Sequence, residues 1–433
     1  MTKYRPCIVE ETLCKMFSPE WLRKTAEETE LVKRERKIDP VIMFWVLTLS
    51  FGVRLQRNLA SLKRSYERES DTTLSYGSWY ERFTPELVDF LHACVIHGIE
   101  HLAQEPSRKL KDKLAGFKDL MIKDTTIIRL HEKLADAYPA ARTRKVAAGI
   151  KVSLLVSAVA NGPKHVALHS ERTGEVKTLK LGKWVKNRIL LMDLGYFKYQ
   201  LFARIVENGG SFVSRLKSNA NPLIVGVNQQ WRGRSIDVVG KRLKDVLPKL
   251  KRNVLDVEVE IEFKRRKYKG KRRKDTKQFR LVAILNKEEK KYHLYLTDIP
   301  RETLSVEDIA RLYSARWDVE LIFKELKSKY ALDAVDTTNP QIIKAYIWIA
   351  ILTLLVSRRI YNLVREQSPE KKIVRFTQLR WSNTFTEMAN DQLTTVLEYC
   401  GIKRNFETVM GVYDSQALDP HVNRERFMDY WRA

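Results

Sequence analysis

Residues 304–332 read LSVEDIARLYSARWDVELIFKELKSKYAL, and this stretch decides how the rest of the chain is interpreted. Ser305 stands three residues before Asp308, which is the capping-box pattern of a helix start. No Pro or Gly interrupts the segment, so it predicts one helix of about 24 residues, roughly 36 Å long. Its apolar residues fall on an arc about 100° wide, which predicts that one face packs into a core.

A polar stripe lies beside this apolar arc. At about 100° per residue, four side chains fall within about 60° of one another, namely Tyr313, Arg316, Glu320 and Lys327. Solvent-exposed ion pairs are the commoner explanation for such charges. Trp317 lies on the same side, however, and a row of solvent-exposed ion pairs does not require an aromatic side chain. The pattern therefore indicates a site in which a carboxylate is flanked by two cations and a phenol.

The spacing Tyr313-(2)-Arg316-(3)-Glu320-(6)-Lys327, with Trp317 directly after the arginine, resembles the signature of DDE transposases of the insertion-sequence-four type. The resemblance implies that Glu320 is the third metal-binding acid and that two aspartates lie upstream. It also implies that the other four side chains contact DNA near the scissile bond, where cations can hold phosphate oxygens.

Two aspartates occupy strand-like segments upstream. Asp124 lies inside the β-branched segment 120–130, and Asp193 ends the apolar segment 188–192. A carboxylate in a buried strand is costly unless it is paired, protonated or bound to a metal. Asp124 with the threonine after it, and the sequence DLGY that begins at Asp193, also resemble the family's first and second acid motifs. The family often has Arg where this chain has Leu194.

Three other acids compete for these roles. Asp119 stands at the entry of its strand and lacks the following threonine, while Asp318 and Glu325 point away from the polar stripe. The resemblance therefore implies that the catalytic residues are Asp124, Asp193 and Glu320. These would bind two Mg²⁺ ions, with Mn²⁺ as a substitute, because hard divalent cations prefer carboxylate oxygens.

The segments between residues 113 and 365 indicate an α/β fold. Three strand-like segments are followed by a strand, a helix and a strand, at 120–130, 149–160, 164–169, 188–192, 197–206 and 211–216. This order is compatible with a ribonuclease-H-like catalytic core, which is the fold that the resemblance implies. The core is predicted in two parts, 113–218 and 299–365, and the second part contains the signature helix.

Asp193 and Glu320 are 127 positions apart, so the core must contain an insertion. Residues 219–298 fill this role, and their strand-like runs at 253–263, 279–285 and 292–296 predict a mostly β subdomain. Its segment KRRKYKGKRRK has nine cations in eleven residues. Such a run is usually a solvated loop, but in a DNA-binding protein it favours a phosphate clamp. The predicted DNA contacts here are Lys264, Arg265, Arg266, Lys267, Lys271, Arg272 and Arg273. The resemblance further implies that Trp231 stacks on an unpaired base.

Both ends of the chain are predicted to be helical. Residues 1–112 contain helical segments at 10–33, 40–55, 59–67 and 85–102. The sequence LSYGSWYERFT at 74–84, with Ser75 or Ser78 as a helix cap, suits a helix-turn-helix, although an ordinary helical bundle fits equally well. The resemblance favours a domain that binds DNA ends. Residues 341–364 predict a long apolar helix, and 366–433 a helical region that packs on the core or forms a dimer contact.

The composition points to a polyanionic partner, because the formal charge is +26 and the pI is about 9.8. Nucleic acid is the first candidate and an anionic membrane surface the second. The longest apolar run, 345–356, has about 12 residues where a bilayer requires about 20, so it predicts a buried helix rather than a membrane span. The N-terminus lacks an apolar signal region, and the four cysteines show no CxxC. Together these features predict a reduced, cytoplasmic protein.

The resemblance implies a DNA transposase that binds the inverted-repeat ends of an insertion sequence. It would carry out cut-and-paste transposition, which is metal-dependent DNA cleavage followed by strand transfer. Both ends must be held together, so a homodimer on double-stranded DNA is expected. Two alternatives remain: a structure-specific nuclease of the same fold, and a DNA-binding protein whose catalysis has decayed, acting as a repressor or scaffold.

Overall fold

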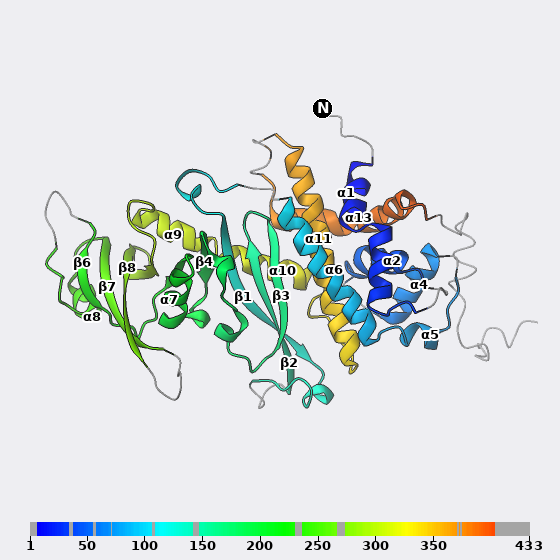
Figure 1. Ribbon diagram of the computed structural model, residues 1–433, viewed down its shortest axis with the longest axis horizontal. Coiled ribbons are helices and arrows are strands. Elements are labelled where there is room, and N and C mark those ends of the chain that lie inside the picture. Colours follow the sequence, from blue (N-terminus) through cyan, green and yellow to red (C-terminus); the bar gives the residue numbers. More distant parts are fainter. Residues whose placement is uncertain are drawn as a thin grey trace, which may run out of the picture.

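The computed structural model describes residues 7–33, 38–54, 58–70, 72–105, 109–141, 147–229, 236–265, 273–369, 372 and 375–402. One sheet runs through most of the molecule, with the helices of both chain ends gathered beside β3 and the insertion at the other end (Figure 1). Its strands are β1 (Asp119–Leu130), β2 (Ala148–Ser157), β3 (Gly162–Ser170), β4 (Arg188–Met192), β5 (Ser211–Arg215), β6 (Leu223–Val227), β7 (Val254–Lys264), β8 (Lys274–Asn286) and β9 (Lys291–Thr297).

The strand order is β3-β2-β1-β4-β5-β9-β8-β7-β6. β2 runs antiparallel to both β1 and β3, whereas β4 runs parallel to both β1 and β5. The first five strands therefore form the mixed α/β sheet of a ribonuclease-H-like core, which confirms the predicted fold class. The predicted strands and the helix between β4 and β5, α7 (Tyr199–Glu207), all form.

The insertion continues the sheet of the core. β9 pairs antiparallel with β5, placing Val213 opposite Thr297, and β8, β7 and β6 follow in turn. Sequence periodicity found three of these four strands and missed β6, which is only five residues long and has a register irregularity between Ile224 and Gly226. The mostly β insertion is thus anchored by a strand pairing rather than by a flexible tether.

The helices fall into three groups. The N-terminal group contains α1 (Ile8–Met16), α2 (Pro19–Glu28), α3 (Pro40–Trp45), the π-helical segment η1 (Val46–Phe51), α4 (Leu59–Glu69), α5 (Tyr76–Tyr80) and α6 (Pro85–Gln104). In and after the insertion lie α8 (Leu243–Val246), α9 (Val306–Ser314), α10 (Trp317–Ser328), α11 (Pro340–Glu366) and α13 (Gln378–Tyr399). Short 3-10 helices lie at Asp112–Leu114, Glu132–Leu134, Glu175–Thr178 (η4), Lys183–Val185, Leu194–Tyr196 (η6) and Leu247–Lys249.

The prediction of one uninterrupted helix across 304–332 is wrong. The capping box of Ser305 and Asp308 forms, but α9 ends at Ser314 and α10 begins at Trp317. Between them the backbone closes tighter bonds of the 3-10 type, from Ala315 N to Leu312 O at 3.1 Å and from Arg316 N to Tyr313 O at 3.0 Å. Tertiary packing breaks the helix here, because α9 packs on β5 and β8 while α10 packs on β1.

The predicted helical segment 10–33 is likewise divided into α1 and α2. Ser18 accepts a hydrogen bond from Trp21 N at 3.1 Å and caps α2, with Pro19 at its first position. Ser75 caps α5, and Tyr76 and Tyr80 are exposed while Trp79 is buried. α6 packs against α11 and β3, so the exposed surface of the expected helix-turn-helix belongs mainly to α5.

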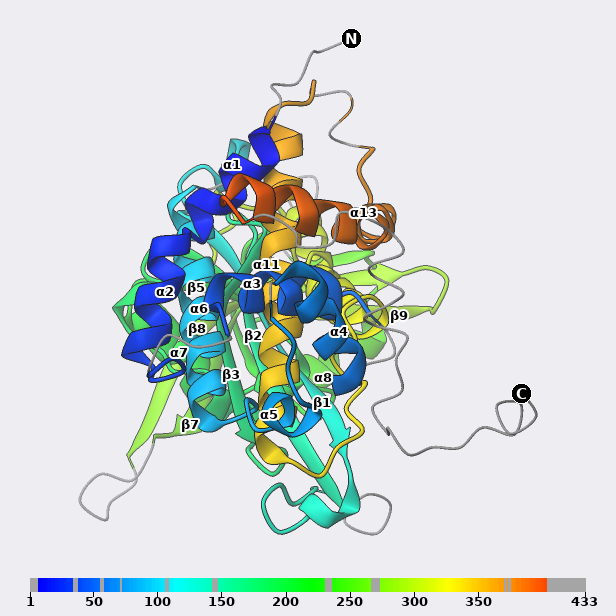
Figure 2. The same ribbon diagram turned by 90° about the vertical axis from the view of Figure 1, so that its right-hand side faces the viewer.

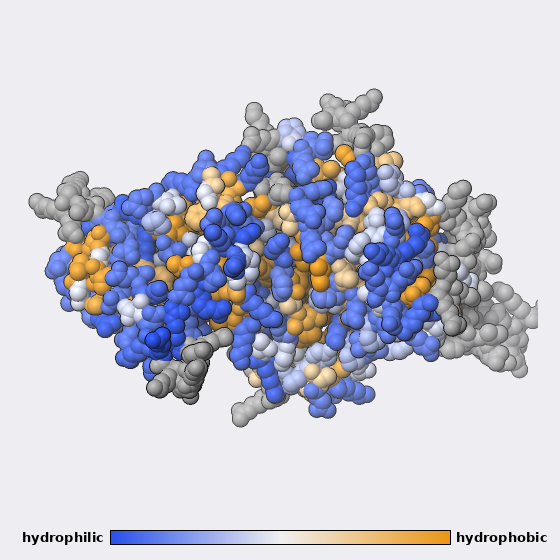
Figure 3. All heavy atoms as spheres, viewed as in Figure 1, coloured by the Kyte–Doolittle hydropathy of each residue, from blue (hydrophilic) through white to orange (hydrophobic). Residues whose placement is uncertain are grey.

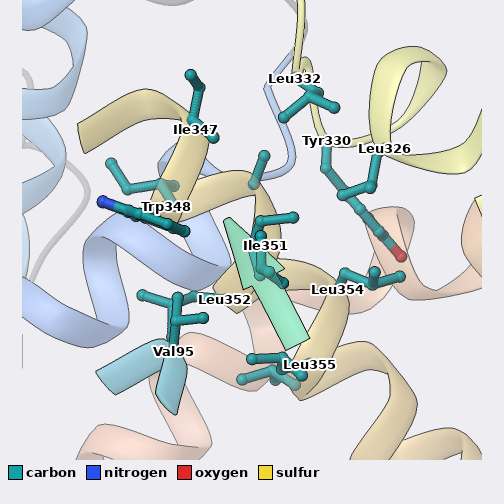
Figure 4. Packing of buried hydrophobic residues seen from close by; sticks show 14 of the residues in the cluster. Val95, Leu326, Tyr330, Leu332, Ile347, Trp348, Ile351, Leu352, Leu354 and Leu355 are labelled. Carbon is teal, nitrogen blue, oxygen red and sulfur yellow. The ribbon is translucent and has the colours of Figure 1, made fainter. Parts of the chain in front are cut away.

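The centre of the helical region is α11, whose predicted existence is confirmed. Nearly every residue from Ile342 to Leu363 is buried, as expected for a helix that is apolar on all sides. Figure 4 shows Tyr330 and Leu326 on one side of α11 and Val95 of α6 on another. By length and composition α11 is apolar enough to cross a membrane, but 83% of its most apolar window is buried inside the protein.

α13 contacts both halves of the helical region. It packs against α1, α3 and η1 of the N-terminal group and also against α10 and α11 (Figure 2). The Sγ atoms of Cys14 in α1 and Cys400 after α13 lie 3.0 Å apart. The face seen in Figure 3 is largely hydrophilic, with smaller hydrophobic areas between the polar groups.

Candidate active site

Asp124 and Asp193 meet at neighbouring positions of two parallel strands. Lys123 of β1 lies opposite Met192 of β4. Asp124 and Asp193 are the next residue on each strand, so they lie at the same level of the sheet. Asp124 shares a strand face with Ile122, which packs toward the helices, because side chains alternate along a strand. Asp193 caps η6 and accepts a weak hydrogen bond from Gly195 N at 3.4 Å.

The environment of Asp124 disfavours its charged form. Burial raises the pKa of Asp124 from 3.8 to about 6, and the nearby charges of Asp193 and Glu175 act in the same direction. The backbone N–H of Thr125, which donates to Asp124 Oδ1 at 2.7 Å, and the guanidinium of Arg316 oppose this shift. Asp193 and Glu175 are therefore close enough to Asp124 to disfavour its charge, and Arg316 and Lys123 are the cations near it.

Glu320 lies on α10 and is paired with Arg316. Arg316 Nη1 donates to Glu320 Oε1 at 2.7 Å, and the side chain of Glu320 is 37% exposed while that of Arg316 is only 11% exposed. The guanidinium also lies 5.9 Å from the ring centre of Tyr313 and 5.3 Å from that of Trp317. Arg316 is thus held by its neighbours on the side of the site that faces the two aspartates.

Tyr313 connects α9 to the end of β4. Its hydroxyl lies 3.5 Å from the carbonyl oxygen of Met192, the residue before Asp193. Burial raises the pKa of Tyr313, and the charge of Asp193 adds to this effect. The phenol therefore stays protonated near neutral pH and can donate a hydrogen bond beside the second aspartate.

The remaining predicted contacts are spread around this centre. Trp317 is 60% exposed, and Lys327 lies in the last turn of α10, with its Nζ 4.0 Å from a carboxylate oxygen of Asp333. Lys264 ends β7 and is exposed, as is Arg273. Trp231, Arg266, Lys267, Lys271 and Arg272 lie outside the described residues.

Arg265, which the sequence predicts to contact DNA, is paired with two acidic side chains in this structure. Its Nε donates to Asp275 Oδ2 at 2.7 Å and its Nη1 to Glu207 Oε2 at 3.2 Å. Its backbone N donates to the carbonyl oxygen of Arg273 at 2.8 Å, which closes the pairing of β7 and β8. The side chain ties this hairpin to α7, a role that a count of cations in the sequence does not reveal.

Carboxylate oxygens suit hard divalent cations, so the donor types of Asp124, Asp193 and Glu320 fit Mg²⁺ or Mn²⁺. The charge repulsion around Asp124 is also what a bound cation would relieve. In the described part of the chain, however, no three His, Cys, Asp or Glu side chains are close enough together to bind one metal ion. Glu320 would have to exchange Arg316 for the metal.

Two residues near the site escaped the sequence analysis. Glu175 of η4 accepts a long hydrogen bond from Thr125 Oγ1 at 3.4 Å, and its carboxylate occupies the space that a Cβ at Gly195 would need. Arg215, at the end of β5, is near enough to Tyr313 to influence its pKa. Sequence periodicity identifies neither residue. The glycine in DLGY does indicate, however, that another group lies close to the backbone at that position.

The fold and the site together define a protein with a ribonuclease-H-like core and a carboxylate-rich site. Two aspartates of this site lie side by side on adjacent parallel strands. The chain belongs to the family described as Transposase DDE domain, whose model matches residues 115–356. This match includes both parts of the core, the insertion and all three candidate acids, so the protein is a member of an enzyme family of insertion-sequence transposases.

Several relatives align with most of the chain. It is 24% identical over 404 residues to the transposase for insertion sequence element IS231F from Bacillus thuringiensis subsp. israelensis, covering 84% of this chain and 81% of that protein. The transposase for insertion sequence element IS1151 from Clostridium perfringens is 21% identical over 366 residues, covering 78% and 77%. A putative transposase, InsL for insertion sequence element IS186A from Escherichia coli (strain K12), is 42% identical over 59 residues, which is 14% of this chain and 16% of that protein.

Among solved structures, the piggyBac transposase synaptic complex with hairpin DNA superposes with a TM-score of 0.46 at 11% identity, covering 99% of this chain and 88% of that one.

Proposed function

We propose that the protein binds the inverted-repeat ends of an insertion sequence, cleaves them and joins the released 3′ ends to target DNA. The observation that carries this proposal is the arrangement of Asp124 and Asp193 at one level of β1 and β4, with Tyr313 beside them and with Arg316, the ion-pair partner of Glu320, near both carboxylates. Tyr313, Arg316, Glu320 and Lys327 would then serve as the signature residues of the insertion-sequence-four type.

Asp124, Asp193 and Glu320 would hold two Mg²⁺ or Mn²⁺ ions. When bound, such ions activate the attacking oxygen and neutralise charge on the leaving oxygen of a phosphodiester. Glu320 would leave Arg316 to reach its ion. The guanidinium so released would be free to bind a phosphate oxygen next to the scissile bond, because its forked donors match phosphate geometry.

Other cations would position the DNA. Lys327 lies about two turns beyond Glu320 on α10, and Arg215 ends the strand next to β4, so both can hold phosphates on either side of the site. Trp317 exposes an aromatic face beside Arg316 on which a terminal base can stack. The basic segment 264–274 would extend this contact along the duplex, with Arg265 serving the hairpin instead of the DNA.

The larger assembly is also part of the proposal. The predicted domains at 1–112 and 366–433 would bind the DNA ends and support a homodimer, because two ends must be held together before joining. The protein would act in the cytoplasm, on the nucleoid. The formal charge of +26 supports a DNA partner, since phosphate contacts supply most of the sequence-independent affinity of such proteins.

The test is cleavage of an oligonucleotide that spans the junction between the flanking DNA of the gene and its terminal repeat, with Mg²⁺. Wild type should cut at the boundary, and Glu320→Gln should lose cutting by a factor of at least about 10³ while binding the oligonucleotide nearly as well. Glu307→Gln, the same substitution at an exposed position of the preceding helix α9, is the matched control and should behave as wild type.

Three results would separate the alternatives. Binding without cutting by wild type, in Mg²⁺ and Mn²⁺ alike, would support a DNA-binding protein with decayed catalysis. Cutting without joining to a target plasmid would support a nuclease. Equal loss of binding and cutting in Glu320→Gln would contradict the role given to this residue.

A further inference from the structure

α10 carries a second glutamate whose surroundings differ completely from those of Glu320. Glu325 is five positions further along the helix, about 140° around its axis. The side chain of Glu325 is 2% exposed, whereas that of Glu320 is 37% exposed. A buried carboxylate needs partners that offset its loss of hydration.

Glu325 receives hydrogen bonds from three separate segments of the chain. Tyr330 Oη, in the turn after α10, donates to Oε1 at 2.8 Å. Gln378 Nε2, in the first turn of α13, donates to Oε2 at 2.7 Å. Arg358 Nη2 of α11 forms a close ion pair with the same oxygen. One carboxylate thus joins α10 to the two long helices behind it.

The network extends one step beyond the carboxylate. The hydroxyls of Tyr330 and Ser357 lie 3.0 Å apart, and Trp381 Nε1 of α13 donates to Ser357 Oγ at 3.0 Å. Tyr330 is fully buried, and Figure 4 shows it beside Leu326 of α10. α11 and α13 therefore each contact the Glu325 network at two points.

We propose that Glu325, Arg358 and Gln378 form a positioning cluster that fixes the rotation and register of α10 and thereby holds Glu320 in line with the two aspartates. The consequence for catalysis rests on the function proposed above. The cluster does not touch DNA or the reacting atoms, so its members are positioning residues and not catalytic ones.

The need for such a cluster follows from the way α10 packs. Its remaining buried side chains are apolar, and apolar attraction has no preferred direction: Val319, Ile322, Phe323 and Leu326. A side-chain tip lies about 5–6 Å from a helix axis, so a rotation of about 20° would move the Glu320 carboxylate by about 2 Å. A displacement of about 1 Å can lower a rate by about 10²-fold. Charged hydrogen bonds at fixed angles prevent this rotation.

Stability alone does not explain the cluster. Well-packed apolar residues often stabilise a fold as well as a buried ion pair does, so the pair is weak evidence for stability. A polar cluster does favour a single geometry, since hydrogen bonds are directional and weaken when the helices turn or slide. Because the cluster is on the same helix as Glu320, a single geometry of the cluster also fixes the position of Glu320.

The first test removes one donor from the edge of the cluster. Gln378→Leu should make amide hydrogen exchange in residues 317–328 faster by a factor of about three or more, and cleavage about tenfold slower at saturating DNA, with oligonucleotide binding unchanged. Gln392→Leu makes the same substitution on α13 outside the cluster and serves as the control. Unchanged exchange and cleavage in Gln378→Leu would overturn the proposal.

The second test replaces the cluster by apolar residues of similar shape, in the variant Glu325→Leu/Tyr330→Phe/Arg358→Met. If the cluster positions α10, this variant should unfold at a urea concentration close to that of wild type and still cleave about tenfold or more slowly, with faster exchange in 317–328. A stable variant that cleaves and exchanges as wild type would refute positioning. Positioning would also be refuted if the variant lost cleavage only in proportion to its loss of folded protein.

Hydrogen exchange separates this proposal from the proposed function. If wild type cuts no DNA, the proposed function fails, but the exchange of 317–328 in Gln378→Leu against Gln392→Leu still decides whether the cluster fixes α10.

Discussion

Asp298, directly after β9, carries a carboxylate that the fold disfavours in its charged form. Burial raises the pKa of Asp298 from 3.8 to about 6, although Phe212 N of β5 donates to Asp298 Oδ1 at 2.8 Å. An asparagine can accept the same hydrogen bond without a charge. We therefore expect Asp298→Asn to stabilise the protein at neutral and alkaline pH.

The size and sign of the effect follow from the pKa difference. One pKa unit corresponds to about 1.4 kcal/mol, so charging Asp298 costs the folded protein at most about 3 kcal/mol. Below pH 3.8 the group is protonated in both the folded and the unfolded chain, and the cost is absent. As the pH rises from 3.8 to about 6 stability is lost, and above pH 6 the full cost remains.

Urea unfolding of wild type and Asp298→Asn at several pH values between about 4.5 and 8.5 measures this difference. The free energy of unfolding of the variant should exceed that of wild type by up to about 3 kcal/mol at about pH 8, and by much less at about pH 4.5. Comparing the two proteins at each pH removes the general acid sensitivity of the chain. The exposed Asp391→Asn on α13 should change stability by no more than about 0.5 kcal/mol at any pH. A variant that is no more stable at alkaline pH, or whose advantage grows toward low pH, would refute the reasoning.

Two further predictions concern the site and its DNA contacts. Gly195→Ala places a Cβ against the Glu175 carboxylate and should slow cleavage about tenfold or more. Gly116→Ala, whose Cβ meets nothing within 4 Å, should leave the rate unchanged. Equal rates in both variants would show that the turn tolerates the collision. Replacing the cations of residues 264–274 by glutamine should lower the slope of log affinity against log salt by about 0.9 for each phosphate that is no longer neutralised. Arg265→Gln alone should leave that slope unchanged, because its guanidinium is already paired, and a reduced slope would mean that Arg265 leaves its acidic partners to bind DNA.

Local sequence patterns determined most of the secondary structure. Alternating and β-branched segments predicted the strands of the core, because side-chain periodicity records which faces are buried. The capping box at Ser305 and Asp308 marked the start of α9, since its hydrogen bonds form within four residues. Asp124 in β1 and Asp193 at the end of β4 were noticeable because a buried charge is costly unless it is paired, protonated or bound to a metal.

Relations between distant segments could not be predicted in this way. The break at Arg316 needs no Pro or Gly, because it arises where α9 and α10 pack on different strands. In the sequence, Arg265 is only one cation of a basic run, whereas the fold places Glu207 of α7 beside it. Helical spacing indicated only that Glu325 points away from the polar stripe of Glu320. The fold surrounds its carboxylate with hydrogen-bond donors from two other helices.

The sequence by itself determined most of the strands and the cap of α9, because each depends on residues a few positions apart, and its resemblance to a known family indicated the three candidate acids. Only the tertiary structure decided that Asp124 and Asp193 lie at one level, that Arg316 is near both of them, and that the insertion continues the core sheet through β5 and β9. These relations depend on strand register and helix packing. Both are set when the whole chain buries its apolar faces together, and no short segment contains that information.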